Sequence, residues 1–279
     1  MKEKVVVNGM ATEDAQAPMD DRGFTLGDGL FETIPIYHGR PFLLTEHLAR
    51  LAQGAKLIGI EPDLAEKKVA FAIAELASAN HVSRGVARLT LTRGLGPRGY
   101  SSHGAGPARW YLTVRPYDPP ERKKTEGGYK VAISPNPVDA ASVLRRIKSV
   151  SALEKVLAIG HAQKTGADEA LSITHDGLIS SLQSANLFWV KDGTLYTPGL
   201  DCAILPGVTR KTVLALAAKE GIKAVEGKFT LEDMRQAQEM FATNSLIEIM
   251  PISQLDTVAE FGGIGPVTNK LHKAYQRML

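Results

Sequence analysis

The stretch Arg145–Ala158 reads RRIKSVSALEKVLA and sets one lysine, Lys148, directly ahead of a helical pattern. The apolar face of that predicted helix carries Leu153, Val156 and Leu157, which recur at helical spacing. A lysine between a strand and a helix is most often a solvated surface group. We nevertheless select Lys148 as the candidate for covalent chemistry, because other segments of the chain supply the groups that such an amine would need.

The composition is that of an ordinary globular protein. The chain has 279 residues, of which 44% are hydrophobic and 23% charged, and this length is enough for two domains. The net charge of +3 is scattered apart from one short basic run at residues 122–124, which does not suggest nucleic acid as a partner. The one cysteine, Cys202, excludes an intramolecular disulfide and any site made of several thiolates. No apolar run is long enough for a signal peptide or a membrane span, so we expect a cytoplasmic protein with no membrane partner. The sequence has no Cys/His spacing typical of a metal site, so we expect no metal.

Strands and helices are mixed in both halves without a regular βαβ alternation, so we predict an α+β fold. Hairpins are expected at Asn8-Gly9 and Asp192-Gly193, and helices starting at the caps Thr45 and Asp63. The polar loop before Gly23 should lead into a strand, a tight turn and a second strand. The predicted organisation is a small N-terminal α+β domain over residues 1–118, a linker at 119–128 and a large C-terminal domain over 129–279.

Three other segments carry residues suited to an anion such as phosphate. Gly207-Val208-Thr209 precedes an amphipathic helix, whose free N–H groups favour negative charge; a plain helix capped by Thr209 is the alternative. The residues 243–245, Thr-Asn-Ser, end a predicted strand and would add hydroxyl groups, or form only a turn. Arg50 lies beside the buried face of the first predicted helix, where it either pairs with a phosphate or extends into solvent. With Lys148 these groups form the set that a pyridoxal 5′-phosphate (PLP) enzyme requires.

Ordered motifs over nearly the whole chain resemble the fold-type IV PLP enzymes. That family includes D-amino acid transaminases, branched-chain aminotransferases and 4-amino-4-deoxychorismate lyases. The motifs are DDRGFTLGDGLFETI, TRGLGPRGYS, IKSVSALEKVLA, ADEALSITHDGLISSLQSANLFWV, ILPGVTR and FATNSLIEIMP. The resemblance implies a two-domain fold of the D-amino acid aminotransferase type with PLP between the domains. It also implies a homodimer in which each active site borrows a loop from the partner.

The resemblance assigns roles to individual positions. Lys148 matches the lysine that binds the cofactor as a Schiff base and moves the proton at the substrate Cα. Arg50 matches the arginine on the cofactor phosphate, Val208 and Thr209 match the helix start that cradles it, and Ser245 matches a further hydroxyl contact.

On the substrate side the family implies a pocket lined by Phe31, Thr33, Arg98 and Tyr100. An arginine beside an aromatic hydroxyl is suited to hold a carboxylate, so we expect a small amino substrate that carries one. Thr33 is also a candidate for returning a proton.

Two positions distinguish the chain within the family. Branched-chain members carry a tyrosine five residues after the lysine, where this chain has Leu153. The glutamate that bonds the protonated pyridine nitrogen belongs at the position of Ser181, and an uncharged serine there leaves the ring a poorer electron acceptor.

The strings RGYS and NSLIEIMP resemble the 4-amino-4-deoxychorismate lyases and narrowly favour such a lyase, which releases pyruvate and 4-aminobenzoate. An aminotransferase of the D-amino acid or (R)-amine type is the alternative, with the branched-chain type less favoured. A PLP-binding homologue with weak catalysis is the third possibility.

Overall fold

The computed structural model describes residues 3–120 and 127–279, and these residues divide into two compact units. One unit contains Met1–Asp118 and Ile147–Ala152, and the other contains Pro119–Arg146 and Leu153–Leu279. The segment that carries Lys148 therefore groups with the N-terminal part of the chain. Part of the predicted linker at 119–128, including the basic run at 122–124, lies outside the described residues.

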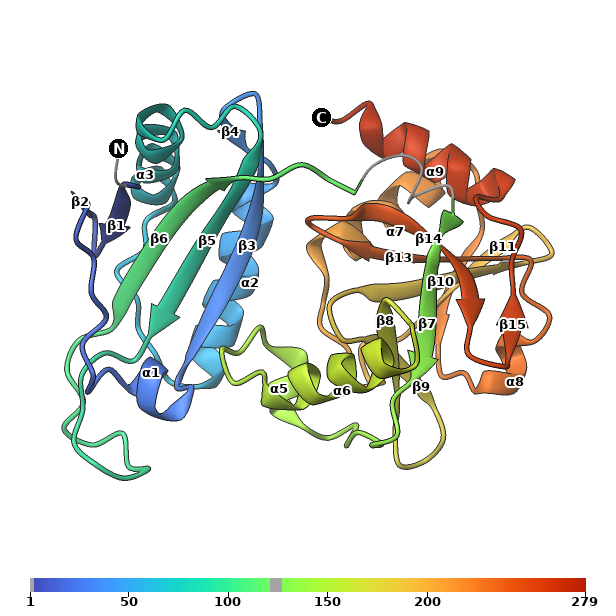
Figure 1. The fold of residues 1–279 in the computed structure, drawn as a ribbon, viewed down its shortest axis with the longest axis horizontal. Helices are drawn as coiled ribbons and strands as arrows, with labels where there is room; N and C mark the ends of the chain where they lie inside the picture. The colour runs from blue at the N-terminus through green and yellow to red at the C-terminus, as the bar shows by residue number, and fades with distance from the viewer. Residues whose placement is uncertain (1–2, 121–126) are drawn as a thin grey trace. The chain divides into compact units, whose positions relative to one another are not determined.

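The N-terminal unit is built on one antiparallel sheet covered by helices (Figure 1). Its strand order is β2-β1-β6-β5-β3-β4. The elements are β1 (Val5–Val7), β2 (Met10–Thr12), α1 (Arg22–Leu26), β3 (Gly29–Tyr37), β4 (Arg40–Pro41), α2 (Leu44–Leu57), α3 (Glu66–Ala79), β5 (Gly85–Thr92) and β6 (Arg109–Pro116). The core lies between the sheet and the helices, and Ile147 from the distant segment joins it.

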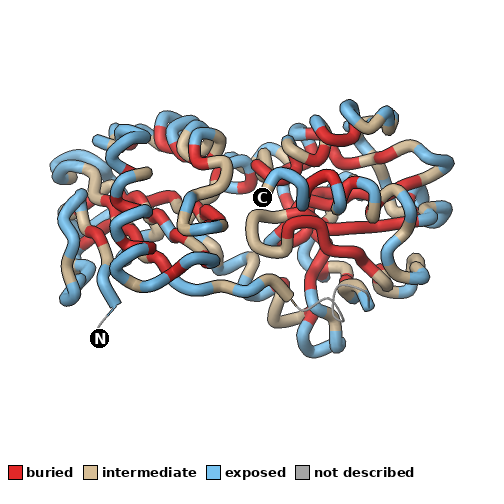
Figure 2. The backbone as a smooth tube through the Cα atoms, turned by 90° about the horizontal axis from the view of Figure 1, so that it is seen from above, coloured by how far each residue is buried: buried red, intermediate tan, exposed pale blue. Residues whose placement is uncertain are grey.

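The C-terminal unit contains a larger, mixed sheet of order β12-β11-β10-β13-β14-β7-β8-β9, with β15 paired to β14. Its strands are β7 (Tyr129–Ile133), β8 (Glu169–Ile173), β9 (Ile179–Leu182), β10 (Asn186–Lys191), β11 (Thr194–Pro198), β12 (Ala224–Gly227), β13 (Glu239–Asn244), β14 (Glu248–Leu255) and β15 (Ala259–Glu260). Its helices are α5 (Val143–Arg146), α6 (Leu153–Lys164), α7 (Val208–Lys219), α8 (Leu231–Met234) and α9 (Pro266–Gln276). Because β9 also contacts β10 and β11, the sheet curls on itself. Buried residues run through the interior of each unit and exposed residues lie around its outside (Figure 2).

The α+β prediction is confirmed, and so are both hairpins, since β1 pairs with β2 and β10 pairs with β11 across the expected turns. Several local predictions were wrong. The helix α2 begins at Leu44 rather than at a Thr45 cap, and the Thr45 hydroxyl instead donates to Glu66 Oε1 at 2.7 Å. The helix α3 begins at Glu66, three residues after Asp63.

Two further expectations were wrong in a way that affects the surface. The segment after Asp21 forms the short helix α1, because the Asp21 carboxylate accepts a hydrogen bond from Gly23 N and caps it. In α6, Leu153, Val156 and Leu157 are 70%, 63% and 60% exposed. That helix instead packs through Ala158 and Ala162 against the alanines of β7 and β8.

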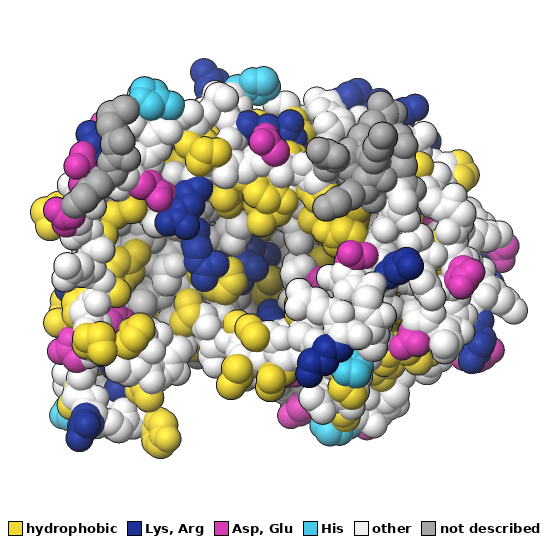
Figure 3. Space-filling view, in the orientation of Figure 1, with side chains coloured by type: hydrophobic (Ala, Val, Ile, Leu, Met, Phe, Trp, Pro, Cys, Tyr) yellow, Lys and Arg dark blue, Asp and Glu magenta, His cyan; other side chains and the backbone are white. Residues whose placement is uncertain are grey.

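Charged side chains of both signs are scattered over the face shown in Figure 3, with hydrophobic side chains exposed among them. Within residues 3–120 and 127–279, no helix is long and apolar enough to cross a membrane. The same residues contain no group of three or more His, Cys, Asp or Glu side chains that could hold a metal ion.

Candidate active site

Lys148 is held beside strand β3 of the N-terminal unit. Phe31 N donates to Lys148 O at 2.9 Å, and Val150 N donates to Gly29 O at 3.1 Å, so the segment runs alongside the strand. The Lys148 Nζ atom lies 4.6 Å from the centre of the Phe31 ring. This ammonium group over an aromatic face is a favourable cation–π contact. The structure thus brings together Lys148 and Phe31, which are far apart in the chain.

Alternation along β3 places Phe31 and Thr33 on the same face of the sheet. Arg88 of β5 lies directly opposite Thr33, and its guanidinium carbon is 4.0 Å from the centre of the Phe31 ring. Burial lowers the pKa of Arg88, although the residue stays exposed enough to meet a ligand. Arg88 was not among the site residues predicted from the sequence. The signal was a lone charge in the otherwise uncharged strand GVARLTLT, opposite a strand already assigned to the substrate.

Arg50 is fixed by a buried carboxylate on the other face of β3. Glu32 is fully buried, and its two oxygens accept from Arg50 Nε at 2.8 Å and Arg50 Nη2 at 2.6 Å. His47 Nδ1, one turn earlier in α2, lies 2.7 Å from the same carboxylate. Burial opposes ionisation of Glu32, but the hydrogen bonds from His47 and Arg50 outweigh it and lower its pKa to about 2. The two hydrogen bonds to Glu32 fix the orientation of the Arg50 side chain. Its contact with a phosphate stays a prediction.

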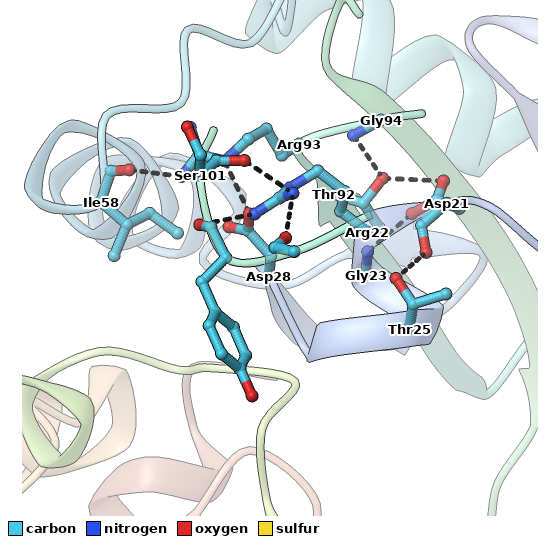
Figure 4. A network of polar contacts seen from close by, with 12 residues as sticks. Asp21, Arg22, Gly23, Thr25, Asp28, Ile58, Thr92, Arg93, Gly94 and Ser101 are labelled. Carbon is cyan, nitrogen blue, oxygen red and sulfur yellow. Dashed lines mark hydrogen bonds and ion pairs between the residues drawn. The ribbon is translucent and has the colours of Figure 1, made fainter. Parts of the chain in front are cut away.

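The loop between β5 and β6, which carries Arg98 and Tyr100, is held at its middle residues by Arg22 (Figure 4). Arg22 Nη1 donates to the carbonyls of Gly99 and Ser101 at 3.2 and 3.0 Å, and Nη2 donates to that of Tyr100 at 3.2 Å. Arg22 Nε in turn donates to Asp28 at 2.9 Å. Three successive carbonyl groups therefore point at one buried guanidinium.

Asp28 ties this loop to the rest of the unit. It also accepts from Arg93 Nε at 2.7 Å, while the other nitrogens of Arg93 donate to the last carbonyls around α2. Burial opposes ionisation of Asp28, but the bonds from Arg93 and Arg22 outweigh it and lower its pKa. Arg98 and Tyr100 themselves are exposed, Tyr100 by 92%. Among the described residues, no hydrogen bond or ring contact joins either of them to Phe31 or Thr33.

In the C-terminal unit, the start of α7 lies next to β10 and β13. The helix begins at Val208 with Gly207 as its N-cap, so the alternative in which Thr209 caps the helix is wrong. A Cβ atom on Gly207 would collide with the side-chain oxygen of Asn186, and glycine is therefore required for this close approach. Asn186 pairs directly with Thr243 across β10 and β13.

The hydroxyl of Thr243 is a buried group without a partner. The residue is 1% exposed, and its Oγ1 has no hydrogen-bond partner in the part of the chain that the structure describes. Such a group costs stability unless a ligand bonds to it. Thr209 is 3% exposed, while Ser245 lies in the turn that follows β13. An unpartnered hydroxyl thus lies across the strand pair from Asn186, whose side chain closely approaches the start of α7, where anions are favoured.

Ser181 lies in β9 of the same unit, where it is buried and donates to Ala185 O at 2.7 Å. The buried carboxylate of Glu169 is committed to the turn after β9. It accepts from the backbone N–H groups of Ala170, Gln183 and Ser184 and from the Ser184 hydroxyl. Burial raises the pKa of Glu169 despite these bonds. The position predicted to face the ring nitrogen therefore offers a neutral hydroxyl.

Comparison with known proteins identifies the family. The family model of class IV aminotransferases matches residues 29–255. The chain is 33% identical to the D-alanine aminotransferase of Listeria monocytogenes serotype 4b, covering 98% of this chain and 94% of that protein. Two solved structures are similar in fold. The branched-chain amino acid aminotransferase of T.th. with pyridoxamine 5′-phosphate has a TM-score of 0.92 and 25% identity, over 99% of this chain and 94% of that one. The 4-amino-4-deoxychorismate lyase of Pseudomonas aeruginosa has a TM-score of 0.85 and 30% identity over 98% of both chains.

The residues present fit PLP, the cofactor of this family. In the N-terminal unit, Lys148 supplies an amine. In the C-terminal unit, taken by itself, the unpartnered Thr243 hydroxyl and the start of α7 supply donors of the kind that a phosphate needs. The chain belongs to the class IV aminotransferases and is a PLP-dependent enzyme.

Proposed function

We propose that this enzyme is a lyase acting on 4-amino-4-deoxychorismate and releasing pyruvate and 4-aminobenzoate. PLP, when bound, supplies an electron-accepting ring that makes the proton next to the substrate nitrogen acidic. Lys148 takes that proton from the carbon that bears the amino group. The electron pair left behind closes the aromatic ring as the carbon–oxygen bond to the three-carbon side chain breaks. Once protonated, the departing side chain is pyruvate, and Thr33 is the candidate donor of that proton.

The main support for this proposal is the neutral side chain of Ser181, at the position where the family has a glutamate. A carboxylate at this position would strengthen the cofactor as an electron acceptor, whereas the Ser181 hydroxyl is neutral and already donates to Ala185 O. Glu169 cannot replace it, because its oxygens are taken by the turn at residues 183–184. In the lyase reaction the negative charge leaves with the side chain and the product gains aromaticity, so a weak electron acceptor is sufficient. Amino transfer depends more strongly on the acceptor, because no group leaves the substrate.

The substrate face of the N-terminal unit suits a molecule with two carboxylates. Arg88 and the Lys148 amine flank the Phe31 ring, and Thr33 is next to Arg88. Arg98 supplies a second guanidinium from the loop held by Arg22. We propose that Arg88 and Arg98 pair with carboxylates and that Phe31 and Tyr100 pack on the substrate ring. Arg50, Val208, Thr209 and Ser245 are proposed to hold the cofactor phosphate.

Aminotransferase activity is the second candidate, because the chain is about equally similar to D-alanine aminotransferases and to branched-chain enzymes. A weakly active PLP-binding homologue is the third. We also propose that the enzyme is a homodimer. The apolar residues Leu153, Val156 and Leu157 of α6 are exposed together with Val143 and Leu144 of α5, and such a surface favours a protein partner.

Two incubations separate the three functions. The enzyme with PLP is mixed with 4-amino-4-deoxychorismate, and separately with D-alanine and 2-oxoglutarate. The lyase proposal expects pyruvate and 4-aminobenzoate in equal amounts from the first and little amino transfer in the second. If glutamate forms at a higher rate than 4-aminobenzoate, the lyase proposal is wrong and the enzyme is an aminotransferase. If neither product appears although PLP is bound, the weakly active homologue is supported.

A further inference from the structure

A buried arginine lies on the Ser181 side of the C-terminal unit without a close carboxylate partner. Arg145 of α5 is 8% exposed, and its Nη2 donates to Ser172 Oγ at 2.6 Å. Gln183 Nε2 donates to the same oxygen at 2.7 Å. The Arg145 Nε and Gln183 Oε1 atoms are buried and have no hydrogen-bond partner among the described residues. The three side chains thus form one cluster, and the cluster is incompletely bonded.

The charge of Arg145 is poorly compensated. Glu154 approaches its Nη1 only to 3.8 Å, and the glutamate side chain is 56% exposed. Burial lowers the pKa of Arg145, and the Glu154 charge only partly offsets this. Burying a guanidinium without a close counter-ion costs stability, so a buried arginine of this kind points to a use for its charge. No other charged contact of Arg145 is present in the described chain.

The cluster shares a face of the sheet with Ser181. The Ser180 hydroxyl donates to Ala203 O, and because side chains alternate along a strand, Ser181 points to the opposite face. Ser181 and Gln183 are two positions apart, and Gln183 bonds to Ser172 on the adjacent strand β8. The register of β8 and β9 shifts between Leu171 and Ile173, which sets Ser172 against this part of β9. Ser172, Ser181 and Gln183 therefore line one polar, positively charged patch.

We propose that Arg145, positioned by Ser172 and Gln183, keeps the pyridine nitrogen of the cofactor unprotonated. This inference rests on the proposed function, because it takes the ring nitrogen to face the position of Ser181. A proton on that nitrogen would create a second cation beside Arg145, and a like charge disfavours protonation. The unprotonated nitrogen accepts hydrogen bonds instead. The Ser172 hydroxyl accepts from both Arg145 and Gln183, so its own proton is left to be donated.

The test is the protonation state of the ring nitrogen, read from the ¹⁵N chemical shift of the enzyme loaded with ¹⁵N-labelled PLP. In the wild type we expect an unprotonated nitrogen from about pH 6 to about pH 9. Arg145→Gln removes the charge and should raise the pKa of the ring nitrogen by about 1–3. Arg146→Gln is the matched control, because Arg146 is the next residue, is exposed and donates only to Ala140 O among the described contacts. It should leave the chemical shift unchanged.

A double variant provides an independent check. Ser181→Glu with Arg145→Gln should give a protonated ring nitrogen at pH 7, whereas Ser181→Glu alone pairs the new carboxylate with Arg145 and should have a smaller effect. Arg145→Lys keeps a positive charge and should keep the nitrogen unprotonated, which covers the case in which Arg145→Gln fails to fold. A protonated nitrogen in the wild type overturns the inference, and so does an equal shift in Arg145→Gln and Arg146→Gln. Failure of the wild type to take up labelled PLP overturns the proposed function instead.

Discussion

Replacing Glu32 by Gln should destabilise the N-terminal unit by about 3 kcal/mol at pH 7. The pKa of this carboxyl is lowered from 4.5 to about 2 in the folded protein. Each unit of difference is worth about 1.4 kcal/mol, so the ionised form adds about 3 kcal/mol to stability. The substitution also leaves the Arg50 guanidinium, which is 10% exposed, without its counter-ion. Breaking a buried ion pair costs about 3–5 kcal/mol, which agrees with that figure.

The pH dependence identifies the cause. Because the folded-state pKa of Glu32 lies below the unfolded value, the stabilisation is complete above about pH 4.5 and is lost as the pH falls toward 2. The difference in free energy of unfolding between wild type and Glu32→Gln should therefore be largest at pH 7 and should shrink at pH 3.

The assay is urea unfolding followed by the fluorescence of Trp110 in a Trp189→Phe background. The chain has two tryptophans, and Trp110 is buried in the N-terminal unit while Trp189 is buried in the other, so this probe reports one unit. Glu66→Gln is the control, since Glu66 makes an exposed bond to Thr45 and its loss should cost no more than about 0.5 kcal/mol. A deficit for Glu32→Gln that is equal at pH 7 and pH 3 would refute the reasoning.

Three further substitutions test the site. Arg22→Lys cannot bond three carbonyls through a planar fork, so proteolysis at residues 98–101 should accelerate and KM should rise about tenfold, with kcat less affected. Arg88→Gln should raise KM for a dicarboxylate substrate by at least about tenfold while the visible spectrum of bound PLP is unchanged, and a normal KM would exclude it from substrate binding. Thr243→Val should weaken PLP binding, measured by titration, but should not lower the melting temperature of the PLP-free protein, because that hydroxyl has no partner among the described residues.

Local patterns predicted much of the fold. The Asn-Gly and Asp-Gly turns fixed two hairpins because few backbone conformations suit those pairs. The predicted helix starts were less accurate. The Thr45 hydroxyl, for example, bonds to Glu66 of the next helix and does not cap its own. In α6 the large apolar residues are exposed and two alanines are buried, because the helix packs closely on β7 and β8. The period of a helix shows where apolar residues recur, but the neighbouring strands determine which face is buried.

The site was only partly accessible from the sequence. Lys148 and Phe31 were each selected, but their contact depends on long-range pairing that no local pattern contains. Arg88 and Arg145 were missed because a single arginine is normally a surface residue, and only the structure shows one stacked on Phe31 and the other buried on Ser172. Conversely, the importance of Ser181 came entirely from its position in a family motif.

The most direct test of the account is to find the lysine that holds PLP. Treatment of the PLP-loaded enzyme with sodium borohydride makes the bond between lysine and cofactor permanent, and peptide mass spectrometry then locates the label. We predict labelling of Lys148 alone and no labelling in Lys148→Ala. Labelling of Lys155, or of any other lysine at the same level, would contradict the central role assigned to Lys148.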